Sequence, residues 1–519
     1  MQNKKQIILS ILAIFVLSVL VIGATFSYFQ AQGDTSSQTS AIVKTYTMDV
    51  FSFETGDAIS FSLNQENFTS GKGNQTGSTF AKAILTANNK TNSATEYYYL
   101  YLNISNNTFT YTQNENTPEI LLTINDGTNP VTNITSLTYK TVTDGKGNTI
   151  SGYDITNKKG LITLFSNREI TTTSTKTENW NITVTFINYN LDQSKNAGHT
   201  FSGKVLIQKE EYKLPLNEYV ISQYTGTQGE NGLYYHNSSL ANGAGDNSYR
   251  YAGASESVNN FVCFGSTTSP CSTDNLYRII GVIDGKVKLI KYDYATSALL
   301  GTDGDYKGSS TPGSAFYKGS LTSINTYYWN YKNNTSINNG YGSNIWSTSL
   351  LNKINLNTNY LNNIGTTWSN LIEDTTWKVS GYSTSSVTPS EMYTGEITNA
   401  TKTYGHSDGT YKIGLMYVSD YGFAASPSAW TTTINDYNGN DANGISIKAI
   451  NWMYMGHNEW TMAPSSSNSY RVFALSINGD VSDGNANHGF GSRPVLYLKA
   501  SVLYAGGSGT KDSPITLVV

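Results

Sequence analysis

Segments of strand length that alternate polar and apolar residues recur through the N-terminal part of this chain of 519 residues. In Trp180–Tyr189 (WNITVTFINY), Trp, Ile, Val and Phe occupy every second position. A period of two places these side chains on one face of a strand, where they pack on a core. Asp-Gly and Gly-Asn pairs, which favour turns, separate the segments. The predicted strands are Thr45–Phe53, Thr79–Asn88, Glu96–Ser105, Glu119–Asp126, Gly160–Phe165, Trp180–Tyr189 and Thr200–Gln208.

This pattern predicts an antiparallel β-sandwich over residues 31–212, because about seven or eight short strands without an intervening helical period are typical of sandwiches. The composition agrees with extended structure and polar turns, since the chain has 38 tyrosines and 46 glycines. Charged residues make up only 13%, and the net charge is -4. Without a basic field, we expect no nucleic-acid partner.

The N-terminus carries an export signal. Lys4 and Lys5 precede an apolar run from Ile7 to Phe26, which as a helix of about twenty residues is long enough to span a bilayer. Lysines before the span favour keeping its start inside the cell. Residues 1–30 are therefore interpreted as a cleaved signal peptide or a retained membrane anchor. Both interpretations place the rest of the chain on the extracellular face of the cell, either anchored in the membrane or secreted.

Residues Gly23, Ala24, Thr25 and Phe26, followed by Tyr28 and Phe29, form the stretch GATFSYF. It resembles the signal region of the TasA/camelysin-like secreted proteins of low-GC Gram-positive bacteria. In that family a run of small residues leads into the first strand of a β-sandwich. The resemblance implies a jelly-roll-like sandwich for residues 31–212 and a role in an extracellular fibre or matrix.

The chain changes character near Lys209–Tyr224, where charges, Pro215 and a short helical pattern coincide, so residues 213–224 are predicted to be a linker. Both cysteines and seven of the eight tryptophans follow it. Asp284-Gly285 between two apolar runs, Leu276–Ile283 and Lys286–Lys291, predicts a hairpin with a type I′ turn. Further along, Leu350, Leu351, Ile354 and Leu361 follow at near-helical spacing, which predicts a helix capped by Ser347 or Thr348.

The C-terminal end also has the sequence pattern of regular secondary structure. The strand Val495–Leu498 is followed by the turn Gly506–Gly509 and by apolar residues from Ile515 to Val518. We expect these segments to form the last hairpin of a sheet. Arg493, just before the strand, is expected to bind a neighbouring carboxylate or carbonyl groups rather than to act in catalysis.

Several C-terminal segments, among them NLYRIIGVIDGKVKLI, NWMYMGHNEWTMAP and GFGSRPVLYL, resemble a surface domain of low-GC Gram-positive gut bacteria. That domain is similar to the formylglycine-generating-enzyme-like branch of the C-type lectin fold. The matching residues are Glu459-Trp460-Thr461, Arg471-Val472 and Phe490 to Arg493-Pro494, with Gly491-Ser492 as an extra pair. The resemblance implies an α+β C-type-lectin-like domain over residues 225–519. The predicted fold class is therefore mainly β, with two domains after an N-terminal helix.

Cys263 and Cys271 lie in one hydrophilic loop after the export signal, and an oxidising exterior predicts a disulfide between them. The resemblance implies that a formylglycine-generating oxidase would carry cysteines after Arg471, where this sequence has none. The five histidines show no zinc-binding spacing. We therefore predict that the protein is not an enzyme.

The loops near the C-terminal strands are rich in amides and acids, as in SINGDVSDGNANHGFG. Such side chains bind sugars or peptides, and their oxygens make Ca²⁺ a possible cofactor. A polar hairpin with Asx turns is favoured over a Ca²⁺ site, and for Trp460 a place in the core is favoured over ligand binding. The candidate ligand-binding residues are Trp460, Tyr470, Asn478, Asp480, Asp483, Asn485, Asn487 and His488.

Together these features predict a cell-surface binding protein of the adhesin type, with a lectin-like domain displayed on a β-sandwich stalk. Its partners would be an extracellular glycan or protein and, through the N-terminal helix, the membrane. The alternative is a structural subunit of an extracellular fibre or biofilm matrix that self-associates by strand exchange.

Overall fold

The computed structural model describes residues 49–68, 72–88, 93–114, 116–302, 316–317, 324–331, 340–398 and 404–519. The predicted N-terminal helix, residues 1–30, and the first residues of the predicted strand Thr45–Phe53 lie outside the described residues. Among the described residues, none of the helices has the length and apolar character needed to cross a membrane. The chain divides into two compact units, Met1–Tyr212 and Lys213–Val519.

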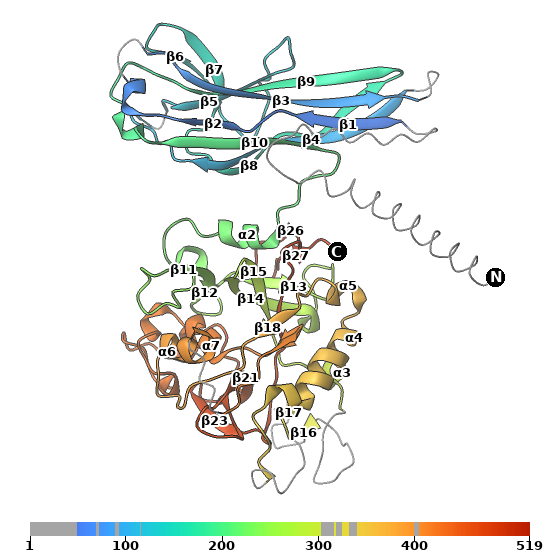
Figure 1. The fold of residues 1–519 in the computed structure, drawn as a ribbon, viewed down its shortest axis with the longest axis vertical. Coiled ribbons are helices and arrows are strands. Elements are labelled where there is room, and N and C mark those ends of the chain that lie inside the picture. The colour runs from blue at the N-terminus through green and yellow to red at the C-terminus, as the bar shows by residue number, and fades with distance from the viewer. Residues whose placement is uncertain are drawn as a thin grey trace, which may run out of the picture. The chain divides into compact units, whose positions relative to one another are not determined.

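The N-terminal unit consists of two antiparallel sheets, drawn in blue to green in Figure 1. The larger sheet has the strand order β1-β3-β9-β5-β7-β6, and the smaller sheet has the order β2-β10-β4-β8. Their strands are β1 (Val50–Thr55), β2 (Ile59–Ser62), β3 (Gln75–Thr86), β4 (Ala94–Asn107), β5 (Ile120–Asn125), β6 (Tyr139–Thr143), β7 (Thr149–Asp154), β8 (Gly160–Thr172), β9 (Thr175–Phe186) and β10 (Thr200–Gln208).

The two sheets of this unit share one hydrophobic core. On β9, Trp180, Ile182 and Val184 are each at most 2% exposed, and Leu100 and Leu102 of β4 line the same core from the other sheet. The alternating apolar residues of the sequence therefore face the core, as predicted, because successive side chains of a strand point to opposite faces.

All seven predicted strands overlap observed ones, but β2, β6 and β7 were not predicted. β6 and β7 form a hairpin at the edge of the larger sheet, and no residue of β6 is buried, so its sequence carries little alternation. The turn depends on Asp144, whose carboxylate accepts the backbone N–H groups of Lys146 at 2.9 Å and Asn148 at 2.8 Å. Side-chain bonds of this kind stabilise turns without a hydrophobic pattern.

A polar cluster ties the two sheets together through the core. The indole Nε1 of Trp180 on β9 donates to the hydroxyl of Tyr98 on β4 at 2.8 Å, and that hydroxyl donates to Glu178 at 2.7 Å. Arg168 on β8 donates to the same carboxylate at 2.9 Å, and its guanidinium lies 4.5 Å from the Trp180 ring centroid. Burial raises the pKa of Tyr98, so its hydroxyl stays a donor.

The C-terminal unit is built around a seven-stranded sheet with the order β11-β12-β14-β15-β25-β20, in which β13 pairs with β14. These strands are β11 (Leu233–His236), β12 (Ser248–Tyr251), β13 (Phe261–Cys263), β14 (Leu276–Ile283), β15 (Lys286–Lys291), β20 (Ile413–Gly414) and β25 (Val495–Tyr497). The other elements are α2 (Leu216–Ser222), α3 (Ser297–Leu300), β16 (Phe316–Tyr317), β17 (Thr326–Tyr328), α4 (Leu361–Asn363), α5 (Thr366–Ser369), β18 (Thr375–Trp377), α6 (Pro389–Tyr393), β19 (Gly409–Tyr411), α7 (Val418–Ala424), β21 (Glu459–Pro464), β22 (Arg471–Leu475), β23 (Val481–Asn485), β24 (Gly489–Phe490), β26 (Tyr504–Gly506) and β27 (Thr516–Leu517).

The hairpin of β14 and β15 is confirmed. Asp284 and Gly285 have φ angles of 50° and 72°, which a type I′ turn requires. The predicted helix is confirmed only in part, because it is a π-helix over Leu351–Tyr360 that continues into α4. Neither Ser347 nor Thr348 caps it; instead the hydroxyl of Ser349 accepts the backbone N–H of Asn352 at 3.2 Å.

Two expectations about segment roles are corrected. The segment 213–224 is not a free linker, because α2 belongs to the C-terminal unit and buries Leu216 and Val220 in its core. The last residues do not form one hairpin with β25. That strand lies between β15 and β20, whereas β26 and β27 pair only with each other. In the central sheet, β25 pairs with a neighbour on each side, and Val495 and Leu496 are fully buried.

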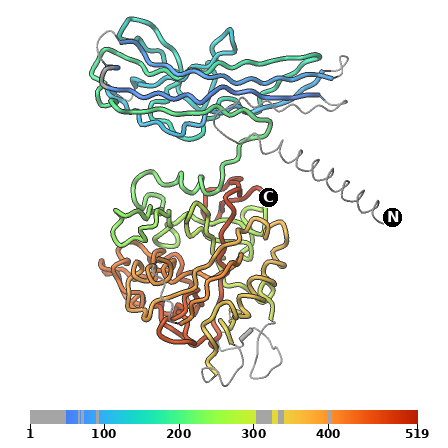
Figure 2. Tube along the Cα trace, in the orientation of Figure 1, coloured from blue at the N-terminus to red at the C-terminus, as the bar shows by residue number. Residues whose placement is uncertain are grey.

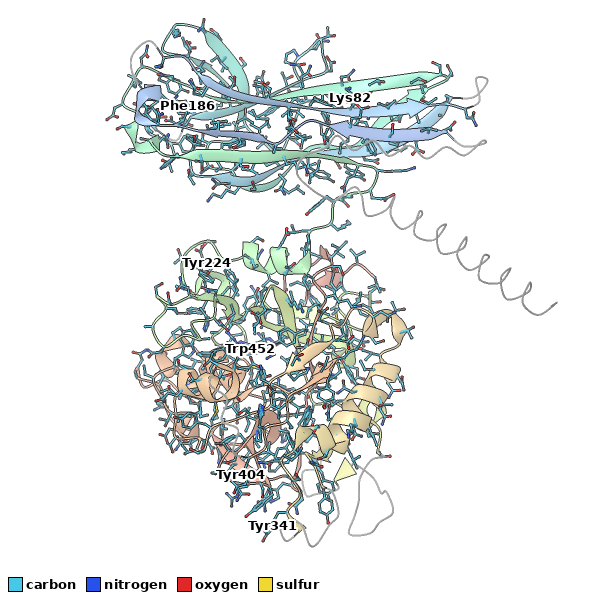
Figure 3. All side chains as sticks on the ribbon, viewed as in Figure 1. Lys82, Phe186, Tyr224, Tyr341, Tyr404 and Trp452 are labelled. Atoms are coloured by element: carbon cyan, nitrogen blue, oxygen red, sulfur yellow. A yellow bond between two sulfur atoms is a disulfide. The ribbon has the colours of Figure 1, made fainter. Side chains whose placement is uncertain are left out.

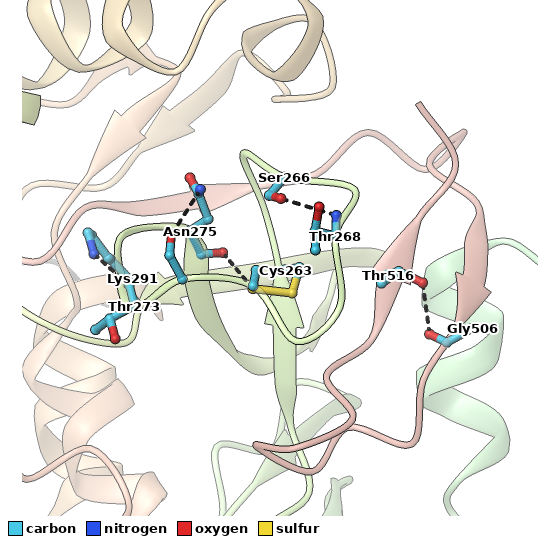
Figure 4. Close-up of a disulfide and its surroundings, with 10 residues drawn as sticks. Cys263, Ser266, Thr268, Thr273, Asn275, Lys291, Gly506 and Thr516 are labelled. Atoms are coloured by element: carbon cyan, nitrogen blue, oxygen red, sulfur yellow. Dashed lines mark hydrogen bonds between the residues drawn. A yellow bond between two sulfur atoms is a disulfide. The ribbon is translucent and has the colours of Figure 1, made fainter.

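The end of the chain closes against the beginning of this unit. Leu216 donates its backbone N–H to Val502 at 2.8 Å, and Tyr504 donates to Leu214 at 2.8 Å. Figure 2 shows the red C-terminal segment beside the green segment that begins the unit. The predicted disulfide between Cys263 and Cys271 is confirmed and lies near the same segment, as Figure 4 shows. Cys263 donates its backbone N–H to Ile515 at 2.8 Å.

We predict that Tyr98→Phe destabilises the N-terminal unit, because the buried indole N–H of Trp180 then loses its acceptor. The free energy of unfolding should fall by about 1–3 kcal/mol. Hydrogen exchange of the β4 and β9 amides, followed by mass spectrometry, measures this loss. Tyr97→Phe is the matched control, since Tyr97 is 42% exposed, and equal effects of the two substitutions would contradict the prediction.

Replacing both Cys263 and Cys271 by serine should lower the free energy of unfolding of the C-terminal unit by roughly 2–3 kcal/mol. The disulfide closes a short loop, with a sequence separation of 8, and so restricts the unfolded chain. Denaturant unfolding with and without reductant checks the prediction. Reductant should lower the denaturant concentration at the unfolding midpoint of the wild type and leave that of the double variant unchanged. An unchanged wild-type midpoint after full reduction would refute the prediction.

Candidate functional site: a tyrosine and amide surface

Apart from Trp460 on β21 and Asp483 in the middle of β23, the predicted ligand-binding residues lie at the two opposite ends of one hairpin. β22 and β23 pair antiparallel, with Arg471 opposite Asn485 and Leu475 opposite Val481. A strand rises by about 3.4 Å per residue, so these two ends are roughly 14 Å apart. Asn478 and Asp480 belong to the turn at one end, and Tyr470, Asn485, Asn487 and His488 gather at the other. The predicted set is therefore not one site.

Trp460, a member of the predicted set for which a place in the core was favoured, lies in the core. Its side chain is fully buried, and the indole Nε1 donates to the backbone carbonyl of Tyr327 at 2.7 Å. Its ring lies 4.5 Å from that of Phe490, measured between centroids. Trp460 belongs to the core that supports the hairpin.

The turn residues form a hydrogen-bonded polar turn. Asp480 accepts a hydrogen bond from the Ser476 hydroxyl and from the Ser476 backbone N–H at 2.8 Å. Asn478 is exposed, and Asp483 is paired with Arg471 at 2.9 Å. Within the described ranges, no three His, Cys, Asp or Glu side chains lie close enough to hold a metal ion. The hydroxyl of Ser476 also accepts the backbone N–H of Asn478 at 3.0 Å, so hydrogen bonds within the turn hold this loop.

The other end of the hairpin meets a segment that the sequence did not single out, Gly340–Tyr341. The rings of Tyr341 and Tyr470 lie 5.1 Å apart between centroids, and Tyr341 is 40% exposed. Asn487 donates its backbone N–H to Tyr341 at 3.2 Å and its Nδ2 to the Gly340 carbonyl at 2.9 Å. Figure 3 shows Tyr341 at one end of the C-terminal unit. We call the residues Tyr341, Tyr470, Asn485, Asn487 and His488 the tyrosine–amide surface.

A buried asparagine holds the loops that carry this surface. Asn344 is fully buried, and its Nδ2 lies within hydrogen-bond distance of the carbonyls of Ser465 at 3.1 Å, Asn468 at 2.6 Å and Arg471 at 3.1 Å. Its backbone N–H donates to Ser469 at 3.0 Å. One side chain thus fixes the whole loop before β22 against the segment that carries Tyr341.

One polar atom beside the rings is left without a partner. Oδ1 of Asn487 is buried and has no hydrogen-bond partner among the described residues. Because the surrounding residues shield it from solvent, it is not open to a ligand in this conformation. His488 is exposed, and its ring lies edge-on to Phe490 at 5.6 Å between centroids. Aromatic faces therefore lie next to neutral donors and acceptors.

The electrostatics of the surface are those of a neutral site. Partial burial, and then the positive charge of Arg471, lower the pKa of His488 below its ordinary value of 6.5. The ring is therefore uncharged at neutral pH. Arg471 itself is paired with Asp483. The surface offers stacking and neutral hydrogen bonds, without a net charge that would attract ions from a distance.

Tyr341 could have been noticed in the sequence, because it stands between Gly340 and Gly342 in NNGYGSN. Both glycines have positive φ angles, 82° and 88°, and a Cβ on Gly342 would lie 2.6 Å from the carbonyl oxygen of Asn330. An aromatic residue between two glycines that must stay small indicates a tight, exposed turn. Its partner Tyr470 lies far along the chain, and no local pattern indicates that contact.

The fold and the site define a mainly β protein of two compact units, the second of which exposes an aromatic surface. Comparisons with protein-family models, with curated proteins and with solved structures give no match for this chain. Its function is therefore inferred from the geometry of the site.

We predict that His488 titrates below 6.5, its ordinary pKa, and that Arg471→Gln raises this pKa part of the way back. A lowered folded-state pKa means that the residue favours folding above about pH 6.5, and that this contribution is lost as the pH falls below it. NMR titration of the histidine ring measures the value. Lys511→Gln, in the loop between β26 and β27, is the control and should leave it unchanged. An unshifted pKa in Arg471→Gln would contradict the prediction.

Proposed function

We propose that this protein is a cell-surface binding protein of the adhesin type, whose C-terminal unit binds an extracellular glycan or protein through the tyrosine–amide surface. The observation that carries the proposal is the ring pair of Tyr341, which is exposed, and Tyr470, which is half-buried, beside Asn487. In this proposal the C-terminal unit is a C-type-lectin-like domain, and the N-terminal unit is a jelly-roll-like stalk.

The chemistry of the surface favours this class of ligand. Tyrosine rings provide large contact areas with little side-chain entropy to lose, and amides add hydrogen bonds that adapt to the partner. A sugar ring or a peptide offers the apolar faces and hydroxyl or amide groups that match such a surface. The low charge of the site disfavours strongly charged ligands.

The surface is also fixed before a ligand arrives. Asn344 binds the loop before β22, and Ala486 donates its backbone N–H to Tyr470 at 2.8 Å. Loops that are already ordered lose less conformational entropy on binding, which leaves more of the contact energy as affinity. This supports a binding surface rather than a loop that is polar only because it is exposed.

The extracellular location is part of the proposal. The apolar run Ile7–Phe26 behind Lys4 and Lys5 provides the export signal, retained as a membrane anchor or removed. The disulfide between Cys263 and Cys271 supports it, because such bonds persist in oxidising compartments.

The second candidate function, a subunit of an extracellular fibre, is favoured by one feature of the N-terminal unit. β8, a strand of 13 residues, is the last strand of its sheet, next to β4. Such an edge has backbone groups with which a strand of another copy could pair.

The test of the binding function is a glycan and extracellular-matrix array probed with the full-length protein, with and without Ca²⁺. We expect saturable binding that Tyr341→Ala and Tyr470→Ala each weaken by about tenfold or more, because each ring would contribute at least roughly 1.4 kcal/mol. Dependence on Ca²⁺ would instead identify a metal site in these loops.

Tyr235→Ala is the matched control, since Tyr235 and Tyr249 form another partly exposed ring pair, 4.6 Å apart between centroids, on β11 and β12. It should leave binding unchanged. Equal losses in all three variants would show that the tyrosine–amide surface is not the site. A folded protein that binds nothing on either array, and forms filaments in electron micrographs, would favour the fibre function.

A further inference from the structure

The core of the C-terminal unit contains a lysine and an aspartate in direct contact, far from the tyrosine–amide surface in the sequence. Nζ of Lys288 on β15 lies 2.5 Å from Oδ2 of Asp420 on α7, and both side chains are 1% exposed. Arg250 on β12 donates to the other oxygen, Oδ1, at 3.2 Å. Asp246 pairs with the same arginine at 2.8 Å.

Aromatic rings surround the lysine and exclude water from the pair. Its Nζ lies 4.4 Å from the ring centroid of Tyr417, 5.3 Å from that of Tyr497 and 5.7 Å from that of Trp377. Burial lowers the pKa of Lys288, which makes its neutral, nucleophilic form easier to reach. An ion pair in such surroundings is costly, because neither charge keeps its hydration.

We propose that Lys288 and Asp420 are joined by an amide bond between Nζ and Cγ, which forms within the folded protein with the release of one water molecule. The burial and the contact of the two groups carry this proposal. It does not depend on the proposed binding function.

The reaction balances with the groups that are present. One proton moves from the ammonium group of Lys288 to Oδ2 of Asp420, which gives a neutral amine and a neutral carboxylic acid. The amine lone pair then forms the N–C bond at Cγ, and the second proton of the nitrogen follows to Oδ2. The Cγ–Oδ2 bond breaks and its oxygen leaves as water. No oxidant, reductant or other reactant is required.

The neighbouring groups are placed to assist each atom that changes charge. Arg250 donates to Oδ1, the oxygen that becomes negative in the tetrahedral intermediate and stays as the amide carbonyl. The backbone N–H of Tyr417 donates to Oδ2, the leaving oxygen, at 2.9 Å. The amine and the acid are already held in contact. The entropy lost in bringing two such groups together, a large part of the barrier to this reaction, is therefore not required again.

The charges that remain after the reaction are still paired. Arg250 keeps Asp246, whose Oδ2 also accepts the hydroxyl of Tyr393 at 2.9 Å. Glu396, buried nearby, accepts the backbone N–H groups of Val418 at 2.8 Å and Ser419 at 3.0 Å. Burial raises the pKa of Glu396 to about 8, so this carboxyl group adds no uncompensated charge at neutral pH.

Two other ion pairs of the same unit show why this one is singled out. Lys286 and Glu373 lie 2.7 Å apart, but their side chains are 36% and 30% exposed, so water keeps both ionised. Arg493 and Glu459 lie 2.7 Å apart and are at most 2% exposed, but a guanidinium is not a nucleophile in proteins. Among the described residues, only Lys288 and Asp420 combine burial, contact and an amine.

The test is tryptic peptide mapping of the denatured full-length protein by mass spectrometry. Trypsin does not cleave at an acylated lysine, so we expect the segment Val287–Lys291 to remain whole and to be joined to Ile413–Lys448. The mass of the joined peptide should equal the sum of the two peptide masses minus one water. Finding the two segments only as separate peptides, with cleavage after Lys288, would overturn the proposal.

The variants Lys288→Arg and Asp420→Ala should abolish the joined peptide, and Lys286→Arg, the matched control on the same strand, should keep it. Because a variant at a buried site can fail to fold, the wild-type map alone decides whether the bond exists. A joined peptide that persists in Lys288→Arg would show that another lysine forms the bond, which would also overturn the assignment.

Discussion

The C-terminal unit depends on the pairing of cations that are buried in a core rich in tyrosine and tryptophan. Arg493 and Glu459 form such a pair, and the guanidinium also donates to the carbonyl of Met453 at 2.8 Å. Among the described residues, Arg278 has no carboxylate at contact distance. It donates to Asn260 at 2.5 Å and to carbonyl oxygens, and lies 4.2 Å from the Phe261 ring centroid. Burial lowers the pKa of Arg278 to about 9. Each cation therefore fixes the segments that supply its partners, because an unpaired buried charge is far too costly.

The binding surface follows from these internal constraints. Glu459 begins β21 and is held by Arg493, and the next residue, Trp460, donates its backbone N–H to Gly491 at 3.0 Å. β21 is thereby fixed next to β22, which fixes the hairpin of β22 and β23. Two loops then meet at one end of that hairpin. One lies between Asn485 and Gly489, and the other precedes Arg471. Trp460, for which a place in the core was favoured, packs beneath this hairpin against Phe490.

The parts of the structure that the sequence predicted are those set by local pattern. Alternation predicted seven of the ten strands of the N-terminal unit, and Asp284-Gly285 predicted a hairpin. Two cysteines in one loop after an export signal predicted a disulfide. The rest depends on contacts between distant residues. Nothing near Lys288 indicates Asp420, and nothing near Tyr470 indicates Tyr341. Asn478 and Asn487 look equivalent in sequence, but the register of one hairpin places them at opposite ends. The apolar spacing near Leu350 predicted a helix, but it did not predict that the backbone hydrogen bonds follow the pattern of a π-helix.

The topology of the C-terminal unit determines which contacts a pulling force on the chain would reach first. The segment after Lys213 pairs with residues near Val502, so the chain end closes over the point at which the unit begins. β25, which precedes this closure, lies between β15 and β20 in the central sheet. A force that separates Leu216 from Val502 is therefore next applied to the pairing of β25 with β15. Strand β15 carries Lys288. An amide bond from that strand to α7 would keep β15 attached even after β25 has been displaced, whereas an ion pair in the same place would be hydrated and lost as soon as water entered.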